Sequence, residues 1–497
     1  MSAFALLTRL VTLALLALAW PHVAFVVAFA IELLRVPRRR LLLELAALGA
    51  ALAFFENAHG PAYAGLGALA LIPFAPRILA MNGLDRYFVA QDRPGTPMNS
   101  HHFVEVKEPL DRSTLARAAA SFQSDTAIAR SFVHEAFLGV ERFVAWHPLF
   151  GRPLRFLDRP LEPADLDARF DLAREPPFRV LHAPREGGFV LVFTVHHSAA
   201  DGTGGFLLLE RLLRRYEEAR TRTPESRFPY EARGRRFREL FAPRGIRWIL
   251  SMVRRHVRPM DKLGVENASL LDDETPQPYS SRHRLLELAW DRWESLKGRG
   301  QERGLSRNDL LLAAALRAAD AWRRARGKPD RPFRVLFPVD LRPLLGLPPS
   351  VQNFVGVVRS DFTIDEVRSP ELPLRVKERV QEARSLEEAV ETPVNLGFLS
   401  VVLPPWAFRI ALRSFDDDPR SFFFSLLWSN VRIPQDLPLP PSTERVWIRG
   451  SLARQPGFGV VVSADGKQLN IALEYLVPLA SDEGVRDFGE RFLAEIG

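Results

Sequence analysis

The chain has 497 residues, of which 47% are hydrophobic and 25% are charged, values typical of a globular protein with about three domain-sized units. It contains no cysteine, which excludes a disulfide framework, a thiol nucleophile, an iron–sulfur cluster and a thiolate zinc site. The net charge is +8, whereas residues 211–262 alone carry +10, so the informative feature is where the charge lies.

The first 80 residues have the composition of a membrane region. Leu10–Ile31 is a run of 22 residues without a charged side chain, long enough to cross a hydrocarbon layer of about 30 Å as a helix. Arg35 and Arg38–Arg40 follow, and a loop of this kind stays on the cytoplasmic side. The apolar runs 41–55 and 57–76 predict either two more spans or a buried or re-entrant hairpin. We expect a protein of the cytoplasmic membrane whose remaining chain lies on the cytoplasmic side.

From residue 81 onward the pattern is that of an α/β chain, and its central feature is a strand, a polar turn and a helix. Phe189–Val195 is a run of β-favouring residues after two glycines, which predicts a buried strand. Apolar residues at helical spacing predict a helix from about Phe206 to Ala219. Side chains alternate across a strand, so His196 and His197 point to opposite faces and only one of them can enter a given cavity.

The turn between this strand and helix carries residue types that suit acyl transfer. A histidine at a strand end most simply packs in the core with its nitrogens satisfied. Here, however, Asp201 can turn back to brace the loop, and Gly202 lets the backbone approach a ligand at a helix start with free N–H groups. A base, a bracing carboxylate and an oxyanion site favour acyl transfer without a serine or cysteine nucleophile.

Residues Val195–Gly202, VHHSAADG, resemble the HHxxxDG signature of the CoA-dependent acyltransferase superfamily. This superfamily includes chloramphenicol acetyltransferase, nonribosomal peptide condensation domains and the bacterial wax ester synthase/diacylglycerol acyltransferases. Further segments resemble parts of the same group in the same order, namely Leu84–Phe88 with Pro97 and Met98, Phe170–Arg179, Gly304–Leu310, Pro338–Pro343, Asn353–Gly356 and Ser429–Val431. Together they cover nearly all of residues 81–497.

The resemblance implies the fold and the division of the chain. We expect an α/β (α+β) protein of two chloramphenicol-acetyltransferase-like lobes, arranged as a pseudo-dimer around a central tunnel. The lobes are expected at residues 81–268 and 280–497, with a linker at 269–279 and the N-terminal membrane helices at 1–80.

The resemblance also implies the roles of the site residues. His197 would be the general base that takes a proton from an alcohol or amine acceptor, and N–H groups near Gly202 would stabilise the oxyanion. Asp201 would pair with Arg342 of the second lobe and hold the loop, a structural role. Secondary candidates are His196, Ser429 and Asn430. No metal and no cofactor are implied, since the acyl group arrives as acyl-CoA or on the phosphopantetheine of a carrier protein.

The basic segment 211–262 contains an amphipathic helix at Gly245–Val257. Its apolar residues share one face and its arginines lie away from that face, a pattern typical of a helix resting on an anionic membrane with Trp248 at the interface. The same pattern fits a helix docked on the catalytic lobes, and its arginines could meet the phosphates of CoA. We favour membrane contact because the N-terminus is hydrophobic. Nucleic acid is the least favoured partner, because no aromatic-flanked binding module is visible.

The remaining elements are predicted from local signals. Ser306 and Asp309 form a capping-box pattern that alone explains both residues and predicts a helix at Arg307–Arg326. His101 and His102 are read as strand residues, not as a second site. The chain is expected to end with a hairpin turning at Asp465-Gly466 between strands Phe458–Ser463 and Leu469–Tyr475, and a helix at Asp482–Ile496.

Three functions are therefore open. The favoured one is a membrane-anchored acyltransferase that joins an acyl thioester to a lipid-like alcohol. The second is a freestanding condensation or ester-forming enzyme that takes its acyl group from a carrier protein, although these 497 residues include no carrier domain. The third is a non-catalytic lipid-binding module on the same scaffold, which the intact set His197, Asp201, Gly202 and Arg342 disfavours.

Overall fold

The computed structural model describes residues 77–134, 142–145, 153–223, 244–257, 267–272, 279–416 and 424–497. The apolar runs at Leu10–Ile31, 41–55 and 57–76, on which the membrane prediction rests, lie outside these ranges. Within them, no helix combines the length and the apolar character that crossing a bilayer requires.

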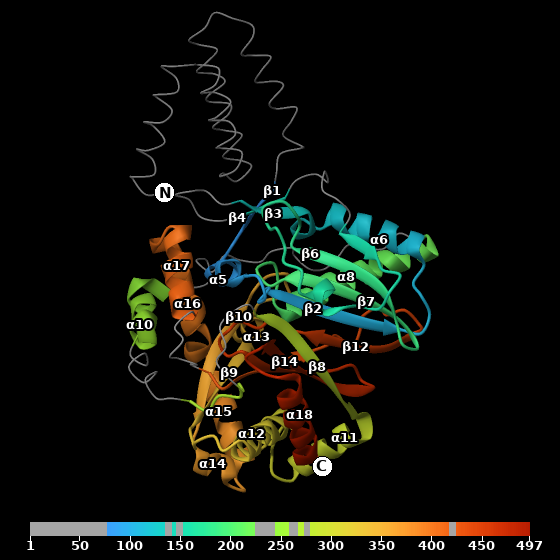
Figure 1. Cartoon of the computed structure of the whole chain (residues 1–497). Coiled ribbons are helices and arrows are strands. Elements are labelled where there is room, and N and C mark those ends of the chain that lie inside the picture. The colour runs from blue at the N-terminus through green and yellow to red at the C-terminus, as the bar shows by residue number, and fades with distance from the viewer. Residues whose placement is uncertain are drawn as a thin grey trace, which may run out of the picture.

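The first lobe is built on a five-stranded sheet with the strand order β12-β2-β7-β6-β5. Its strands are β2 (Asn99–Val106), β5 (Leu154–Phe156), β6 (Phe178–Arg185), β7 (Gly188–His196) and β12 (Thr443–Arg449). Helices α6 (Arg112–Asp125) and α8 (Gly202–Thr221) pack against each other beside this sheet (Figure 1). The predicted strand and helix around His197 are thus confirmed as β7 and α8.

A small sheet adjoins this lobe in the order β1-β4-β3. Its strands are β1 (Arg77–Ala80), β3 (Ser131–His134) and β4 (Arg142–Ala145). The short elements η2 (Ile128–Arg130) and α7 (Pro163–Leu166) complete the first lobe.

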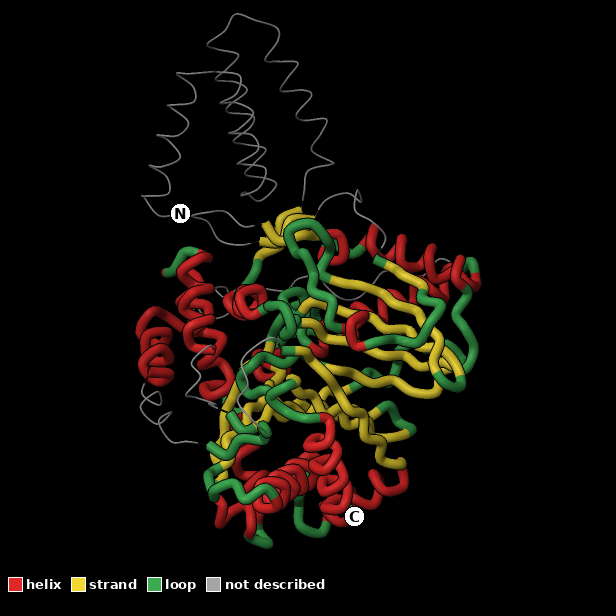
Figure 2. Tube along the Cα trace, in the orientation of Figure 1, coloured by secondary structure: helices red, strands yellow, loops and turns green. Residues whose placement is uncertain are grey.

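The second lobe is built on a six-stranded sheet with the order β10-β9-β11-β13-β14-β8. The strands are β8 (Ser280–Ala289), β9 (Phe333–Asp340), β10 (Val355–Phe362), β11 (Leu426–Arg432), β13 (Phe458–Ala464) and β14 (Gln468–Val477). Its helices are α11 (Trp290–Gln301), α12 (Arg307–Ala325), α13 (Leu341–Leu345), α14 (Ile364–Arg368), α15 (Leu372–Ala383) and α18 (Asp482–Ile496). Figure 2 shows the strands of both lobes in the middle of the molecule with helices towards the outside.

Local signals predicted this lobe well. Ser306 accepts the N–H of Asp309, and the Asp309 carboxylate accepts the N–H of Ser306, which confirms the capping box at the start of α12. The hairpin β13–β14 and the terminal helix α18 are also where the sequence predicts them. These elements depend on contacts within a few residues, and such contacts are visible in the sequence.

A layer of helices lies beside the two lobes. It consists of α5 (Gly83–Gln91), α10 (Gly245–Val257), α16 (Leu386–Val402) and α17 (Pro405–Asp416), and α16 packs against both α5 and α10. Met252 of α10 is buried, and Trp248 and Ile249 pack partly buried against the same cluster as Val390 and Val394 of α16. Trp248, Ile249 and Met252 therefore contact protein, in agreement with the interpretation of this segment as a helix docked on the lobes, and contact of α10 with a membrane stays a prediction.

Strand β12 joins the two lobes. It lies late in the chain, yet it pairs antiparallel with β2, where Arg449 is opposite His101. Trp447 stacks on Phe103 with 3.8 Å between ring centroids, and the cluster of buried side chains around the first sheet includes Trp447. The division at 269–279 assigns β12 to the second lobe by sequence, whereas in space this strand completes the sheet of the first lobe.

Candidate active site

His196 and His197, the two histidines at the end of β7, contact different sets of residues, as strand alternation predicts. His196 is fully buried, and its Nδ1 accepts the backbone N–H of Ser198 at 3.1 Å. Its Nε2 lies 3.7 Å from the Asp92 carboxylate. His196 thus belongs to the packed interior of the first lobe.

His197 lies at the junction of three elements. Its ring is half-buried and stacks on Phe88 of α5 with 3.8 Å between ring centroids and 17° between the planes. Its Nδ1 lies 3.1 Å from Oδ1 of Asn353, just before β10, and its backbone N–H donates to the carbonyl of Met98 at 2.7 Å. The ring is held in place on both its face and its Nδ1 edge, and it is not sealed in the core.

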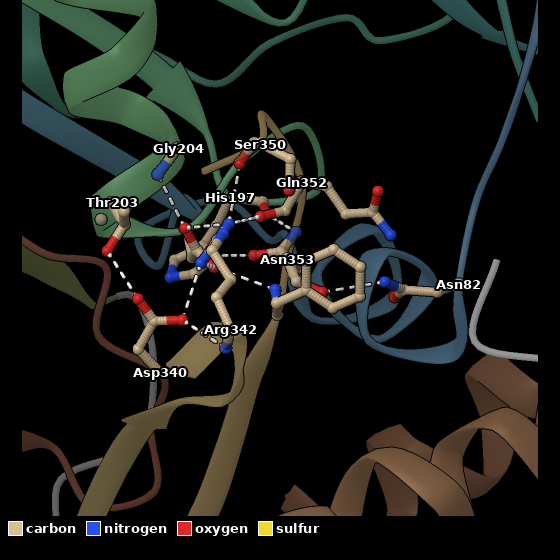
Figure 3. Close-up of polar contacts among 12 residues, drawn as sticks. Asn82, His197, Thr203, Gly204, Asp340, Arg342, Ser350, Gln352 and Asn353 are labelled. Atoms are coloured by element: carbon tan, nitrogen blue, oxygen red, sulfur yellow. Dashed lines mark hydrogen bonds and ion pairs between the residues drawn. The ribbon is translucent and has the colours of Figure 1, made fainter. Parts of the chain in front are cut away.

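The Asn353 side chain determines which nitrogen of His197 carries the proton. The Asn353 Nδ2 group donates to the carbonyl of His197 at 2.5 Å and to Oδ1 of Asp85 at 2.8 Å. Because these acceptors hold the amide nitrogen, the amide oxygen faces His197 (Figure 3). An amide oxygen only accepts hydrogen bonds, so Nδ1 of His197 carries the proton and Nε2 has the lone pair.

Asp85 is itself positioned by a helix cap. One carboxylate oxygen accepts the N–H of Asn82 at 2.8 Å, and the side-chain oxygen of Asn82 accepts the N–H of Asp85 at 2.8 Å. The other carboxylate oxygen is the one that contacts Asn353. The Asn82 side chain also donates to the Asn353 carbonyl at 3.0 Å, so the start of α5 holds Asn353 from two directions.

Burial lowers the pKa of His197 below its usual value, while the negative charge of Asp201, the ring's own backbone carbonyl and the hydrogen bond to Asn353 oppose this shift. The net direction is downward, so the ring is neutral at pH 7. A neutral histidine with its lone pair on Nε2 has the protonation state that a general base requires.

Asp201 and Arg342, which the resemblance places together, form a buried bidentate ion pair. The two guanidinium NH2 groups donate to the two carboxylate oxygens at 2.9 and 3.1 Å. Asp201 also caps α8 by accepting the N–H of Gly204 at 2.8 Å, and it accepts the N–H of Phe354 at 2.9 Å. One carboxylate therefore connects the helix after His197 with the segment that carries Asn353.

Arg342 contacts this segment from the other side. It donates to the carbonyls of Ser350 at 2.9 Å and Gln352 at 2.6 Å, and to the Asp340 carboxylate at 3.0 Å (Figure 3). Gln352 immediately precedes Asn353 in the chain. The ion pair thus fixes the backbone that holds the Asn353 amide against His197.

Gly202 begins α8, beside strand β11. A Cβ atom added there would lie 3.3 Å from Cγ1 of Val431, so a side chain at position 202 would crowd the contact between α8 and β11. Asp201 already accepts the N–H groups of Gly204, through its side chain, and Gly205, through its carbonyl. At this helix start, the N–H groups of Gly202 and Thr203 are the ones suited to contact a ligand.

Of the two secondary candidates on β11, Asn430 hydrogen-bonds to α12. The amide of Asn430 and the indole N–H of Trp428 donate to Oδ1 of Asn308, at 3.1 and 3.0 Å. Ser429 precedes Asn430 on the same strand and is half-buried. A role for Ser429 and Asn430 in substrate contact stays a prediction.

His101 and His102 are buried in β2, in agreement with their interpretation as strand residues. Nδ1 of His101 lies 3.0 Å from the hydroxyl of Thr194, and the ring of His102 packs edge-on against Phe206. Burial lowers the pKa of His102 to about 4. The ring of His102 also explains why position 205 is a glycine, because a Cβ atom there would lie 2.3 Å from the imidazole.

Sequence reasoning missed the roles of Phe88, Asp85 and Asn353. These residues lie in segments that the resemblance singles out, Leu84–Phe88 and Asn353–Gly356, but no local pattern assigns them to His197. The Asn82-x-x-Asp85 spacing predicts a helix cap, which accounts for only one of the two carboxylate oxygens. The second contact joins residues 268 positions apart.

Sequence comparisons find similarity to a known protein over part of the chain. No protein-family model matches the chain. The phthiocerol/phthiodiolone dimycocerosyl transferase of Mycobacterium leprae is 31% identical over 168 residues, which are 33% of this chain. The chain spans 39% of the length of this curated relative.

Solved structures match over most of the chain. Polyketide synthase associated protein 5 from Mycobacterium tuberculosis has a TM-score of 0.59 at 19% identity, covering 85% of this chain and 99% of its own. The first condensation domain of the CDA synthetase has a TM-score of 0.63 at 17% sequence identity, and the match covers 84% of this chain and 95% of that domain. The epimerization domain from the third module of tyrocidine synthetase B has a TM-score of 0.59 at 15% sequence identity, and the match covers 85% of this chain and 95% of that domain. The expected two-lobed fold is therefore confirmed.

Proposed function

We propose that this protein, which has the two-lobed fold of condensation domains, is an acyltransferase that moves an acyl group from a thioester to an alcohol or amine, with His197 as general base. The observation that carries the proposal is the contact between His197 Nδ1 and Asn353 Oδ1, which leaves the lone pair on Nε2 of a half-buried ring. The curated relative is a transferase, and condensation domains are among the structures with this fold.

The proposed reaction proceeds in two proton-balanced steps. Nε2 of His197 takes the proton of the acceptor O–H or N–H while the oxygen or nitrogen attacks the thioester carbonyl carbon. The N–H groups of Gly202 and Thr203 stabilise the oxyanion of the tetrahedral intermediate. Collapse of the intermediate breaks the carbon–sulfur bond, and the leaving thiolate takes the proton back from His197. Asp201 and Arg342 position the loop and exchange no proton.

The finer assignments follow from the sequence. We favour acyl-CoA as donor and a lipid-like alcohol as acceptor, bound in a tunnel between the lobes that passes His197. A carrier-bound donor is the second candidate, and the solved structures with this fold include the first condensation domain of the calcium-dependent antibiotic synthetase. The apolar composition of residues 1–80 supports anchoring in the cytoplasmic membrane with the lobes on the cytoplasmic side. A periplasmic signal from a reporter fused to the C-terminus of the full chain would contradict this orientation.

The test compares donors and a His197 variant. The full chain, solubilised in detergent, is given labelled acyl-CoA or an acyl-loaded carrier protein, together with long-chain alcohols, diacylglycerol or amines. We expect acceptor-dependent thiol release that His197→Ala reduces by roughly 10²-fold or more. The matched control is His134→Ala, which removes a half-buried histidine of β3 and should leave turnover unchanged.

The outcomes separate the three functions. Turnover with acyl-CoA supports the favoured function, and turnover with the loaded carrier alone replaces it with the second. Equal turnover of the wild type and His197→Ala would remove the assignment of the base. Binding of labelled lipid without any turnover, for either donor, would identify a lipid-binding module in place of an enzyme.

A further inference from the structure

Large apolar side chains are exposed together on helices α16 and α17. Among the described residues, five such side chains are exposed, and four of them lie between positions 399 and 410. We call these four the apolar ridge, and they are Leu399, Val402, Trp406 and Ile410, with 38%, 59%, 53% and 61% of their surface exposed. Leu399 and Val402 are one turn apart at the end of α16, and Trp406 and Ile410 are one turn apart on α17.

The internal packing of α17 does not require the ridge. The opposite face of this helix is already buried, since Phe408 is 2% exposed and packs with Leu84 of α5 and Leu396 of α16. A surface helix ordinarily directs polar residues to the side away from the core. Apolar residues gathered on that side mark a surface that contacts another phase or molecule.

Positive charge lies on α10, a helix that packs against one of the two helices of the ridge. Helix α10 packs against α16, on the same side of the molecule as α17 (Figure 1). The exposed face of α10 carries Arg247 and Arg254 with Leu250 between them, and Leu250 is 45% exposed. Arginines beside exposed aliphatic residues and a tryptophan fit an anionic bilayer surface, where indole rings settle at the interface and arginines attract the headgroups.

The chain enters this region from an apolar segment. Residues 57–76 contain no charged side chain and lead directly into β1 (Arg77–Ala80) and then α5. Helix α5 packs on both α16 and α17. The contact is close, because a Cβ added at Gly83 would lie 2.4 Å from the backbone nitrogen of Gly397. An uncharged, largely apolar segment is therefore joined to the fold a few residues before α5, the helix that packs on α16 and α17.

We infer that the apolar ridge, together with the exposed face of α10, is a docking surface for an anionic lipid bilayer. The same helix α5 that packs under the ridge supports His197 through Phe88 and Asp85. Docking would thus bring the bilayer to the side of the molecule where α5 borders the candidate active site. The docking surface does not depend on the acyl transfer proposed above, because its test measures contact with lipid and does not measure turnover.

The absence of native cysteine allows a direct test. The full chain with Val402→Cys carries a single thiol on the ridge, which is labelled with an environment-sensitive fluorophore. The matched control is Glu490→Cys, an exposed position on α18 at the far end of the molecule from α17 (Figure 1). Both proteins are reconstituted into vesicles of phosphatidylcholine with about one third phosphatidylglycerol, with and without lipids brominated near the headgroup.

We expect brominated lipid to quench the label at position 402 at least about twofold, and the label at position 490 not at all. Equal quenching at the two positions, or none at 402 while the protein co-floats with the vesicles, would overturn the proposal. A different pair of results would assign the ridge to a second copy of the chain. These results are that brominated lipid does not quench the label at position 402, and that unlabelled Val402→Cys forms a disulfide-linked dimer as the protein concentration rises. The exposed side chain of Val402 makes little contact with the core, so the substitution leaves folding intact.

Discussion

At the residue scale, the orientation of one amide connects the structure to the proposed chemistry. Asn353 can hold His197 in the tautomer with a free Nε2 only because Asp85 and the His197 carbonyl occupy its NH2 group. A rotated amide would place N–H groups against Nδ1 and reverse the tautomer. Asn353 is therefore a positioning residue, and its effect should be seen in catalysis more than in substrate binding.

Asn353→Leu tests this role. The variant loses the acceptor for Nδ1–H of His197, and we expect kcat to fall by roughly 10²-fold with little change in the KM for the thioester, because the base loses its orientation. Steady-state kinetics measure both constants. The control is Asn470→Leu, which removes another buried amide, one that donates to the carbonyl of Val446 at 3.1 Å, away from His197. Equal losses of kcat in the two variants would show that Asn353 is merely structural.

The pH profile tests the base itself. Burial is the largest influence on His197 and lowers its pKa below 6.5, so the ring is deprotonated and active above that value and is protonated as pH falls. We expect kcat/KM to decline on the acid side with a midpoint below 6.5. A midpoint above about 7 would mean that a group other than His197 limits the reaction.

At the element scale, the site depends on how α8 meets the segment before β10. Asp201 caps α8 and pairs with Arg342, and the same guanidinium holds the carbonyl of Gln352 beside Asn353. Both members of the pair are almost fully buried, Asp201 at 1% and Arg342 at 3% exposure. Such a pair contributes little net free energy when complete, but a single deletion leaves a charge without a partner in a poorly solvated place.

We therefore expect Arg342→Met to lower the free energy of unfolding by about 3–5 kcal/mol, measured by urea denaturation. The double variant Arg342→Met with Asp201→Asn should lose less than the sum of the two single variants, because the fully buried position 201 no longer holds an unpaired charge. Glu217→Ala, which breaks an exposed pair with Arg220, serves as the control and should have a much smaller effect. Strictly additive losses would contradict the coupling of Asp201 and Arg342.

At the scale of the whole molecule, the lobes meet at β12 and at a buried group of charges beside it. Arg449 of β12 donates to the Asp167 carboxylate of the first lobe at 3.2 Å and lies 3.5 Å from Glu474 of β14. Glu474 also accepts the N–H of Gly450 at 2.6 Å. Burial is the largest influence on Glu474 and raises its pKa to about 7, against the attraction of Arg449.

This shift predicts how stability changes with pH. Between an ordinary glutamate value of 4.5 and about 7, the folded protein holds a proton on Glu474 that the unfolded chain has released. The stabilisation from this proton is complete below 4.5 and is lost as pH rises through 7. We expect the free energy of unfolding of the wild type, relative to Glu474→Gln, to decrease between pH 5 and pH 8. Parallel stability curves for the two proteins would contradict the raised pKa.

Several features of this protein follow from its sequence alone. The strand–turn–helix around His197, the capping box at Ser306, the hairpin β13–β14 and helix α18 are all local. Each is set by hydrophobic periodicity or by hydrogen bonds between residues a few positions apart, which a linear pattern records. The pairing of Asp201 with Arg342 was also expected, through the resemblance to a known superfamily and not through any local signal.

Only the tertiary structure decided the remaining features. It joins Asn353 to Asp85 and His197, places β12 in the sheet of the first lobe, and turns the apolar face of α10 towards α16. The physical reason is the same in each case. Periodicity states that a face is apolar or that a side chain can form a hydrogen bond, but the partner of that face or side chain is selected by packing between segments far apart in the chain.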